Sequence, residues 1–327
     1  MPIRCRPVGT TAGTAGQGPR RVDAYELDGG GGLRAVVWTY GATLAELWVP
    51  DGAGGSVNVA VGFPDLAGYE SLKNPYLGAT LGRFSRNVGH GRFRLDGVEY
   101  QLDLNDRGHH MHGGREGFSR LVWEAEPDPA TMSLTLRLVS PDGDQGYPGE
   151  LSAETVYRLG EHGIEFEHRA TTTAPTVVDL TNHTYWNLAG GGTIDGHTLR
   201  IGGTRAIRFG ERMVPVPGPP EPLRGTEHDF TRPRPLRGTA IDRFFVLDGP
   251  VGTVELAHPA SGRAMRVTTD APGTGVYTAD RFARPRSGIC LQTSALPDAP
   301  NRPDFPSVRL DPGQVYRSRT VHEFTAG

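Results

Sequence analysis

The feature that most constrains the fold of this chain is the short spacing between apolar stretches and turn residues. The sequence contains 46 glycines and 27 prolines among 327 residues, and apolar stretches such as 33–40 and 45–49 lie between clusters of Gly, Pro and Asp. This spacing is typical of short antiparallel strands, and no long segment with the helical period of 3.6 residues competes with it. The sequence therefore predicts an all-β fold, a large twisted antiparallel β-sandwich.

One hairpin can be predicted in detail. Phe93 and Leu95 alternate with arginines, Asp96-Gly97 supplies a tight turn, and Val98 and Tyr100 alternate on the far side. An Asp-Gly pair between two alternating stretches is a strong hairpin signal, because both turn residues tolerate the left-handed backbone that a two-residue turn requires.

The rest of the chain indicates one domain preceded by a tail. Alternating leucines lead into the Gly- and Pro-rich loop 140–149 and alternation resumes after it, so a second strand pair is expected there. Residues 1–20 are rich in Gly, Thr and Ala with little hydrophobic pattern, which is typical of a flexible tail. Because the remainder has no internal repeat and no low-complexity linker, residues 21–327 are predicted to form a single β-sandwich domain.

The charge balance favours a small neutral molecule as the partner. There are 34 Lys and Arg against 37 Asp and Glu without a run of like charge, so neither a nucleic acid nor a membrane is an expected partner. Cys5 and Cys290 are far apart in the sequence, which argues against a disulfide framework and fits a cytoplasmic location. We recognise no secretory signal and no 18-residue apolar stretch. Whether the chain forms a homodimer is left open.

The segment Val178–Leu188 concentrates candidate chemistry. It places one titratable ring, His183, among hydrogen-bonding and aromatic side chains in a stretch that alternates like a strand. Such a strand can direct an imidazole into a cleft. The alternative is that Asn182 and His183 are hydrogen-bonded polar residues of the core.

A second group of histidines lies in Asn105–Gly114, where three histidines occupy four positions. This density raises a zinc hypothesis. Neither cysteine belongs to a paired motif, however, and no further ligands stand at defined spacing. The segment is better interpreted as a loop that presents His112, and His110 as a second candidate, with no metal and no cofactor.

Three other segments carry candidate polar residues. Arg83 is flanked by a glycine, which lets the backbone approach a ligand closely; the alternative is a solvated basic turn. Asp242 precedes an apolar run and suits bidentate hydrogen bonding of neighbouring hydroxyls, or it is a surface turn residue. Gln292 brings an amide to the end of an apolar strand and by itself indicates little.

In order and wording, these segments resemble the aldose 1-epimerase (galactose mutarotase) family from about Val22 to Phe324. The resemblance implies a β-supersandwich fold, Arg83, His112 and Asp242 as binders of sugar hydroxyls, and His183 as the general acid that protonates the ring oxygen. Asn87, His110 and Tyr185 are further candidates for substrate binding. The resemblance implies no metal or organic cofactor. The motifs that carry it are Tyr40-Gly41-Ala42-Thr43, Asn74-Pro75-Tyr76-Leu77-Gly78-Ala79-Thr80, Gly82-Arg83, Met111-His112-Gly113-Gly114, Ser140-Pro141-Asp142-Gly143 with Gly146-Tyr147-Pro148-Gly149, Asn182-His183-Thr184-Tyr185, Ile241-Asp242 and Pro297-Asp298-Ala299-Pro300-Asn301.

Two departures from the family pattern bear on catalysis. The resemblance implies that the catalytic base, a glutamate, occupies the position of Gln292, and a neutral amide cannot accept the proton. The Asn-Arg pair that usually follows Gly-Arg is inverted here as Arg86-Asn87. General acid/base catalysis typically contributes about 10²–10⁴-fold to a rate. We therefore expect an altered or weakened base.

Three hypotheses for the function follow. The first is an aldose 1-epimerase in which another group, such as His112 or a water held by Gln292, takes the proton. The second is a redirected enzyme that uses His183 and His112 as acid and base in dehydration, conjugate addition or cyclisation of a non-sugar biosynthetic intermediate. The third is a sugar-binding module that performs no catalysis.

Overall fold

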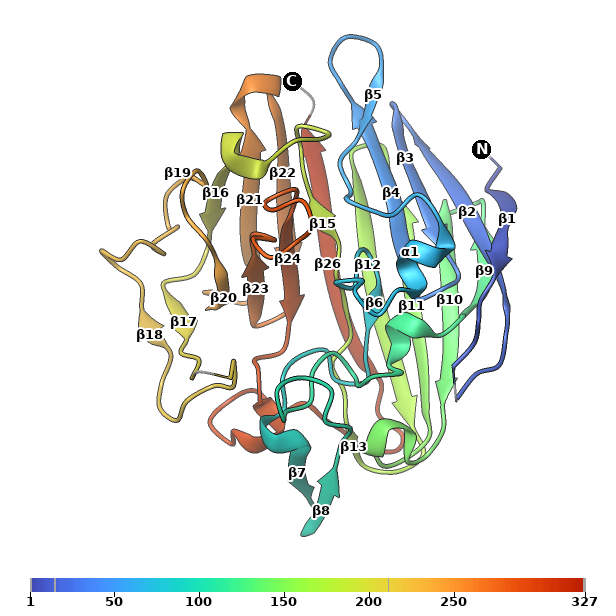
Figure 1. Cartoon of the computed structure of the whole chain (residues 1–327), viewed down its shortest axis with the longest axis vertical. Coiled ribbons are helices and arrows are strands. Elements are labelled where there is room, and N and C mark those ends of the chain that lie inside the picture. The colour runs from blue at the N-terminus through green and yellow to red at the C-terminus, as the bar shows by residue number, and fades with distance from the viewer. Residues whose placement is uncertain (1, 15, 211, 326–327) are drawn as a thin grey trace.

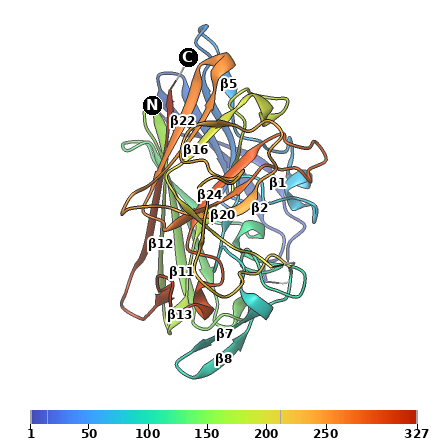
Figure 2. The same cartoon turned by 90° about the vertical axis from the view of Figure 1, so that its left-hand side faces the viewer.

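A computed structural model describes residues 2–14, 16–210 and 212–325 and arranges them as antiparallel sheets in two layers (Figure 1). One layer is a nine-stranded sheet in the order β19-β16-β21-β22-β26-β12-β11-β10-β9. Figure 2 shows this sheet on one side of the molecule, with β1, β2, β20 and β24 on the other. The strands of the nine-stranded sheet are β9 (Glu124–Asp128), β10 (Ser133–Ser140), β11 (Leu151–Leu159), β12 (Gly163–Thr172), β16 (Thr198–Ile201), β19 (Arg234–Pro235), β21 (Gly252–His258), β22 (Arg263–Thr269) and β26 (Tyr316–Thr325).

The second layer contains a five-stranded and a six-stranded sheet. The five-stranded sheet runs in chain order through β1 (Arg4–Thr10), β2 (Arg21–Gly30), β3 (Leu33–Trp38), β4 (Thr43–Pro50) and β5 (Ser56–Asn58). The six-stranded sheet has the order β15-β24-β23-β20-β17-β18, with β15 (Tyr185–Trp186), β17 (Arg205–Ile207), β18 (Glu221–Pro222), β20 (Asp242–Val246), β23 (Gly273–Tyr277) and β24 (Ile289–Ser294).

Period-two alternation divides the six-stranded sheet into a core face and an open face. Phe245, Val276 and Leu291 are buried in the main hydrophobic cluster, which also takes in side chains of β2, β3, β10, β11 and β12. Their neighbours along each strand therefore point the other way. The core thus fills the space between the layers and leaves the open face of β20, β23 and β24 for a site.

Shorter elements connect these sheets or lie at their edges. The two-stranded sheets are β13 (Thr176–Val177) with β25 (Arg309–Leu310), β14 (Thr181–Asn182) with β6 (Thr80–Leu81), and β7 (Arg92–Leu95) with β8 (Val98–Gln101). The helical pieces are α1 (Leu66–Glu70) and 3₁₀ turns at Gly89–Gly91, Phe118–Arg120, Asp144–Gly146, Ile194–Gly196, Pro259–Ser261 and Ala299–Asn301. Among the described residues, the helices are all too short to cross a membrane.

The structure confirms the strand pairs that the sequence predicts. β7 pairs with β8 so that Leu95 faces Val98, and both turn residues, Asp96 and Gly97, have positive φ. β10 pairs with β11 across the loop that follows Ser140. The all-β fold class is confirmed by these antiparallel sheets.

Two local predictions need correction. Residues 4–10, expected to lie in a flexible tail, form β1 and pair antiparallel with β2. The side chains of β1 are mostly exposed, so its main-chain hydrogen bonds leave no hydrophobic pattern in the sequence. The segment Val178–Leu188 is not one strand, because it crosses between sheets and contributes only β14 and β15.

Candidate active site

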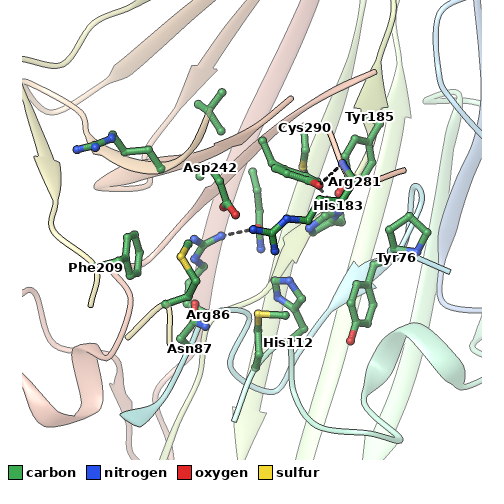
Figure 3. A pocket seen from close by; sticks show the side chains of 18 of the residues that line it. Tyr76, Arg86, Asn87, His112, His183, Tyr185, Phe209, Asp242, Arg281 and Cys290 are labelled. Carbon is green, nitrogen blue, oxygen red and sulfur yellow. Dashed lines mark hydrogen bonds between the residues drawn. The ribbon is translucent and has the colours of Figure 1, made fainter. Parts of the chain in front are cut away.

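A cavity of about 240 Å³ opens on the free face of the six-stranded sheet (Figure 3). We call it the sheet-face cavity. Its floor is made by β20, β23 and β24. Segments around residues 75–87 and 107–112, together with Phe209 and Met213, supply its walls. This volume lies just below the usual range of small-molecule sites, about 300–1,000 Å³, so it suits a ligand of about the size of a monosaccharide.

The floor consists of two rows of residues that the strand register aligns. Across β20, β23 and β24, Phe244 lies opposite Gly275 and Gly275 opposite Gln292. In the adjoining row, Asp242 lies opposite Tyr277 and Tyr277 opposite Cys290. Directly opposed residues share a face of a sheet, so both rows project toward the cavity.

His183 is held at the cavity by its own main chain. Its N–H donates to the carbonyl of Ala79 at 2.9 Å, and its carbonyl accepts from the N–H of Gly78 at 3.1 Å. Its Nδ1 lies 3.7 Å from Sγ of Cys290, whose thiol stays protonated because burial raises its pKa. The ring therefore has a fixed position on the cavity wall, beside Tyr185.

His112 faces His183 from a strained turn. His112 has φ of 56°, in the left-handed region, and the following Gly113 has φ of 83°. A Cβ at Gly113 would lie 1.7 Å from the carbonyl oxygen of Gly82, so only glycine fits there. The Nδ1 of His112 donates to the carbonyl of Ser85 at 2.6 Å. Because a carbonyl only accepts, the neutral ring has its lone pair on Nε2.

Arg86 crosses the cavity floor as a buried cation. The residue is 9% exposed, its Nη1 donates to Oε1 of Gln292 at 2.5 Å, and its guanidinium carbon lies 4.8 Å above the ring of Phe244. A Cβ at Gly275 would lie 2.6 Å from Nη1. The glycine therefore makes room for the guanidinium between Gln292 and Phe244.

Burial and the charge of Arg86 set the protonation states in the sheet-face cavity. Burial, assisted by the Arg86 charge, lowers the pKa of His183 to about 3. Burial, with His183 and Arg86 nearby, lowers the pKa of His112 well below its usual range. Burial also lowers the pKa of Arg86, to about 10, so the guanidinium stays charged at neutral pH. Burial raises the pKa of Asp242, while Arg86 acts against that rise. At neutral pH both imidazoles are neutral beside a cation.

Six of the residues predicted from the sequence line the sheet-face cavity. They are His112, His183, Gln292, Asn87, Tyr185 and Asp242. Asp242 is exposed to the opening, whereas the other five are buried. Figure 3 shows His112, His183 and Asp242 around the same opening. His112 lies in a loop, His183 in the link between β14 and β15, and Asp242 in β20.

Arg83, predicted to bind hydroxyls, lies outside the cavity lining. Its guanidinium is buried and donates to Oγ of Ser140 and to the carbonyls of Ser140, Pro141 and Pro148. These bonds use its donors to fix the loop that joins β10 to β11. A Cβ at Gly82 would lie 2.4 Å from Cδ2 of Leu180, so the glycine beside Arg83 serves packing in this structure.

His110 also lies outside the cavity lining. Its Nδ1 lies 2.8 Å from the carbonyl of Asp103 and its Nε2 lies 2.7 Å from the hydroxyl of Tyr147. Burial lowers its pKa to about 4. The adjacent His109 instead accepts at Nδ1 from the N–H of His90. The histidines of this loop therefore have separate partners, and the described residues contain no group of three or more potential metal ligands.

Several cavity residues are absent from the sequence-based site prediction. The sequence indicates Arg86 only as one half of an inverted pair, and Cys290 only as a cysteine without a partner. Tyr76, whose ring centroid lies 4.8 Å from that of His112, carries a signal in the Asn-Pro-Tyr motif. Arg281 and Phe209 also line the cavity, but their loops have no pattern that indicates it.

Comparisons with known proteins show which proteins this chain is similar to. The model of the aldose 1-epimerase family matches residues 23–323. A galactose mutarotase of Homo sapiens is 34% identical over 334 residues, which cover 92% of this chain and 96% of the relative. The solved structure of a GalM/aldose epimerase homologue from C. elegans has a TM-score of 0.87 at 25% identity and covers 92% of this chain and 98% of that one. A galactose 1-epimerase from Lactobacillus acidophilus has a TM-score of 0.86 at 23% identity with full coverage of both chains.

The fold and the sheet-face cavity together define a galactose mutarotase-like β-sandwich protein. This confirms the fold class predicted from the sequence. The match to the family model over residues 23–323 and the 34% identity to a galactose mutarotase show that the chain belongs to the aldose 1-epimerase family.

Proposed function

We propose that the protein is an isomerase that interconverts the two anomers of an aldose by acid/base ring opening. The observation that carries this proposal is the pair of imidazoles of His112 and His183, whose ring centroids are 5.1 Å apart at the wall of the sheet-face cavity. Relatives named galactose mutarotase and aldose 1-epimerase favour a sugar substrate. They favour it over acid/base chemistry on a non-sugar intermediate and over binding without catalysis.

In the proposed reaction, His183 donates a proton to the ring oxygen while His112 removes the proton of the anomeric hydroxyl. The bond between C1 and the ring oxygen breaks, and the open-chain aldehyde rotates about the C1–C2 bond. The former ring oxygen then attacks the other face of the carbonyl. Both protons return in the reverse direction, so the cycle leaves the two histidines as they began.

The base in this proposal is Nε2 of His112, since Nδ1 donates to the carbonyl of Ser85. Gln292, at the position where the family resemblance implies a carboxylate, has its amide oxygen bonded to Arg86. We assign Gln292 a positioning role, because an amide orients the guanidinium but accepts no proton. Since the cation also disfavours an imidazolium, this acid/base pair is expected to be weak at neutral pH.

The remaining predicted residues are proposed to bind substrate hydroxyls. The carboxylate of Asp242 is exposed to the opening and can accept from two neighbouring hydroxyls. Asn87 and Tyr185 supply an amide and an aromatic wall on the buried side. A sugar has apolar ring faces and hydroxyl groups at its edge. The aromatic ring of Tyr185 suits the faces, and Asp242 and Asn87 suit the hydroxyls.

The direct test is anomer exchange on the purified protein. Two-dimensional exchange NMR with glucose, galactose and other aldoses is expected to show interconversion faster than in buffer, proportional to protein concentration. Binding of the same sugars is measured separately by calorimetry. Exchange at the buffer rate with every aldose, at concentrations that saturate binding, would overturn the proposal.

The pH dependence provides a second prediction. Burial and the charge of Arg86 lower the pKa of His183 to about 3. Above that pKa, the protonated fraction of the acid grows about tenfold for each pH unit of acidification. The pKa of His112 is lowered too, so the base stays unprotonated. We therefore expect kcat/KM, corrected for the buffer reaction, to rise as the pH falls from about 8 to about 5. A fall with a midpoint near 6.5 would contradict this assignment.

A further inference from the structure

Arg86 is a buried cation with no carboxylate within ion-pair distance among the described residues, and Asp179 and Asp242 act on it only from farther away. The residue is 9% exposed, and the ion pairs within 2–14, 16–210 and 212–325 do not include it. Its neighbours are the amide of Gln292 and the face of Phe244. Burying a cation without a counter-charge costs free energy, so this guanidinium is poised to gain an anionic partner.

The guanidinium also has unused donors. Nη1 bonds to Gln292, whereas the buried Nε has no hydrogen-bond partner among the described residues. Arg86 itself lines the sheet-face cavity. A guanidinium presents its N–H groups in a planar fork that matches the two oxygens of a carboxylate.

Among the described charged side chains that line the cavity, arginines without an ion pair outnumber carboxylates by one. Of the other lining arginines, Arg243 pairs with Glu221 and Arg107 pairs with Asp106. Arg281 is exposed at the opening, and no carboxylate of the described residues lies within ion-pair distance of it. Asp242 is the one carboxylate among the described lining residues. Asp242 balances one of Arg86 and Arg281, so a ligand with one negative charge would balance the charges of the cavity lining.

We propose that the substrate is an aldose that carries a carboxylate, of the uronic acid class, and that this carboxylate binds the guanidinium of Arg86. The proposal rests on the proposed function for the sugar part of the substrate. A monoanion matches the single excess charge, and the small cavity favours a compact group. A sugar phosphate also presents anionic oxygens that a guanidinium can bind, so the binding of sugar 6-phosphates is compared in the test.

Such a substrate would also assist the reaction. The charge of Arg86 is one cause of the lowered pKa of both histidines. A carboxylate on the guanidinium opposes that effect and makes the protonated form of His183 more accessible. The anion should therefore raise kcat as well as lower KM, which separates it from a group that contributes only binding.

The first experiment compares matched ligands on the wild-type protein. Calorimetry with galacturonate and galactose, and with glucuronate and glucose, is expected to show about tenfold tighter binding of the acid, the order expected for one charge-assisted contact. The preference should shrink as salt is added. Equal affinities for acid and neutral sugar would overturn the proposal, as would tighter binding of the 6-phosphates than of the uronates.

The second experiment uses variants. Arg86→Gln is expected to reduce the acid-to-neutral preference to less than about twofold, while Arg94→Gln, an exposed arginine on β7, should retain it. If Arg86→Gln does not fold, Gly275→Ala displaces the guanidinium, because the added Cβ would meet Nη1. The preference should again fall. An unchanged preference in a folded Arg86→Gln or Gly275→Ala protein would contradict the proposal.

Glu211, which follows Gly210 in the sequence, lies outside the described residues and gives a third variant. If the counter-charge of Arg86 is the ligand, Glu211→Gln should keep the wild-type preference. A preference for the acid that appears only in Glu211→Gln would mean that the protein itself supplies the counter-charge, which would overturn the proposal.

Binding and exchange are measured separately, so that the two proposals can fail independently. Tight uronate binding without exchange would contradict the proposed function alone, whereas exchange of neutral hexoses without an acid preference would contradict this inference alone.

Discussion

Anomer exchange by the His183→Ala variant is expected to fall by about 10²-fold relative to wild type near pH 5.5, the lower end of what a positioned acid contributes. The lower end applies because His183, with its pKa lowered to about 3, is protonated in only a small fraction of molecules at that pH. The variant should also lose the rise of kcat/KM on acidification, since that rise tracks the protonation of this ring. Exchange NMR across the pH series measures both effects.

The matched control is His168→Gln, another buried histidine. His168 lies outside the sheet-face cavity, and its Nδ1 lies 3.0 Å from the hydroxyl of Thr155. Burial alone lowers its pKa, to about 4, so the replacement perturbs the fold in a similar way without touching the reaction. If both folded variants lose exchange equally, or if His183→Ala keeps wild-type exchange, His183 is not the acid.

Much of the fold can be predicted from the sequence because its signals are local. The Asp-Gly turn of the β7–β8 hairpin and the alternation of β10 and β11 appear directly in the residue order, and the structure has them in the expected register. β1 escapes prediction because an edge strand with exposed side chains is stabilised by main-chain hydrogen bonds. Main-chain pairing of this kind does not require any particular side chain.

The candidate site residues could be predicted by type but not by position. The sequence identifies residue types suited to binding or proton transfer, and the cavity does gather His112, His183 and Asp242. It cannot tell which polar group is already bonded elsewhere. Arg83 and His110 have the right chemistry but use their nitrogens on the carbonyls of a loop, on Asp103 and on Tyr147. Only the folded chain brings those partners close.

The two departures that the family resemblance implies involve residues that lie together in the site. In the sequence, Gln292 and the Arg86-Asn87 inversion lie about two hundred positions apart. In the structure, the guanidinium of Arg86 and the amide of Gln292 are hydrogen-bonded across Gly275. A carboxylate at position 292 would form an ion pair with this arginine. The amide instead leaves the positive charge available to a ligand.

The Gln292→Glu variant tests this relation and is expected to exchange neutral hexoses about 10²-fold faster than wild type at pH 7, within the range of a positioned base. The new carboxylate would lie against Nη1 of Arg86, where the amide oxygen now lies. It supplies a proton acceptor beside the cavity. Its negative charge also opposes the effect of Arg86 on His183, so the pKa of His183 should rise from about 3 toward its usual range. Exchange NMR and the pH profile of kcat/KM measure both consequences, and the profile should be flatter near neutral pH.

The same substitution should weaken uronate binding, because a glutamate that pairs with Arg86 removes the charge the substrate carboxylate would meet. Gln292→Asn is the control: it keeps an amide but shortens the side chain, so it should not accelerate hexose exchange. Faster hexose exchange together with a lost acid preference would mean that one buried arginine–amide pair sets both the strength of the acid/base pair and the charge of the preferred substrate. A folded Gln292→Glu protein that is slower than wild type on hexoses would show instead that the missing carboxylate does not limit the reaction.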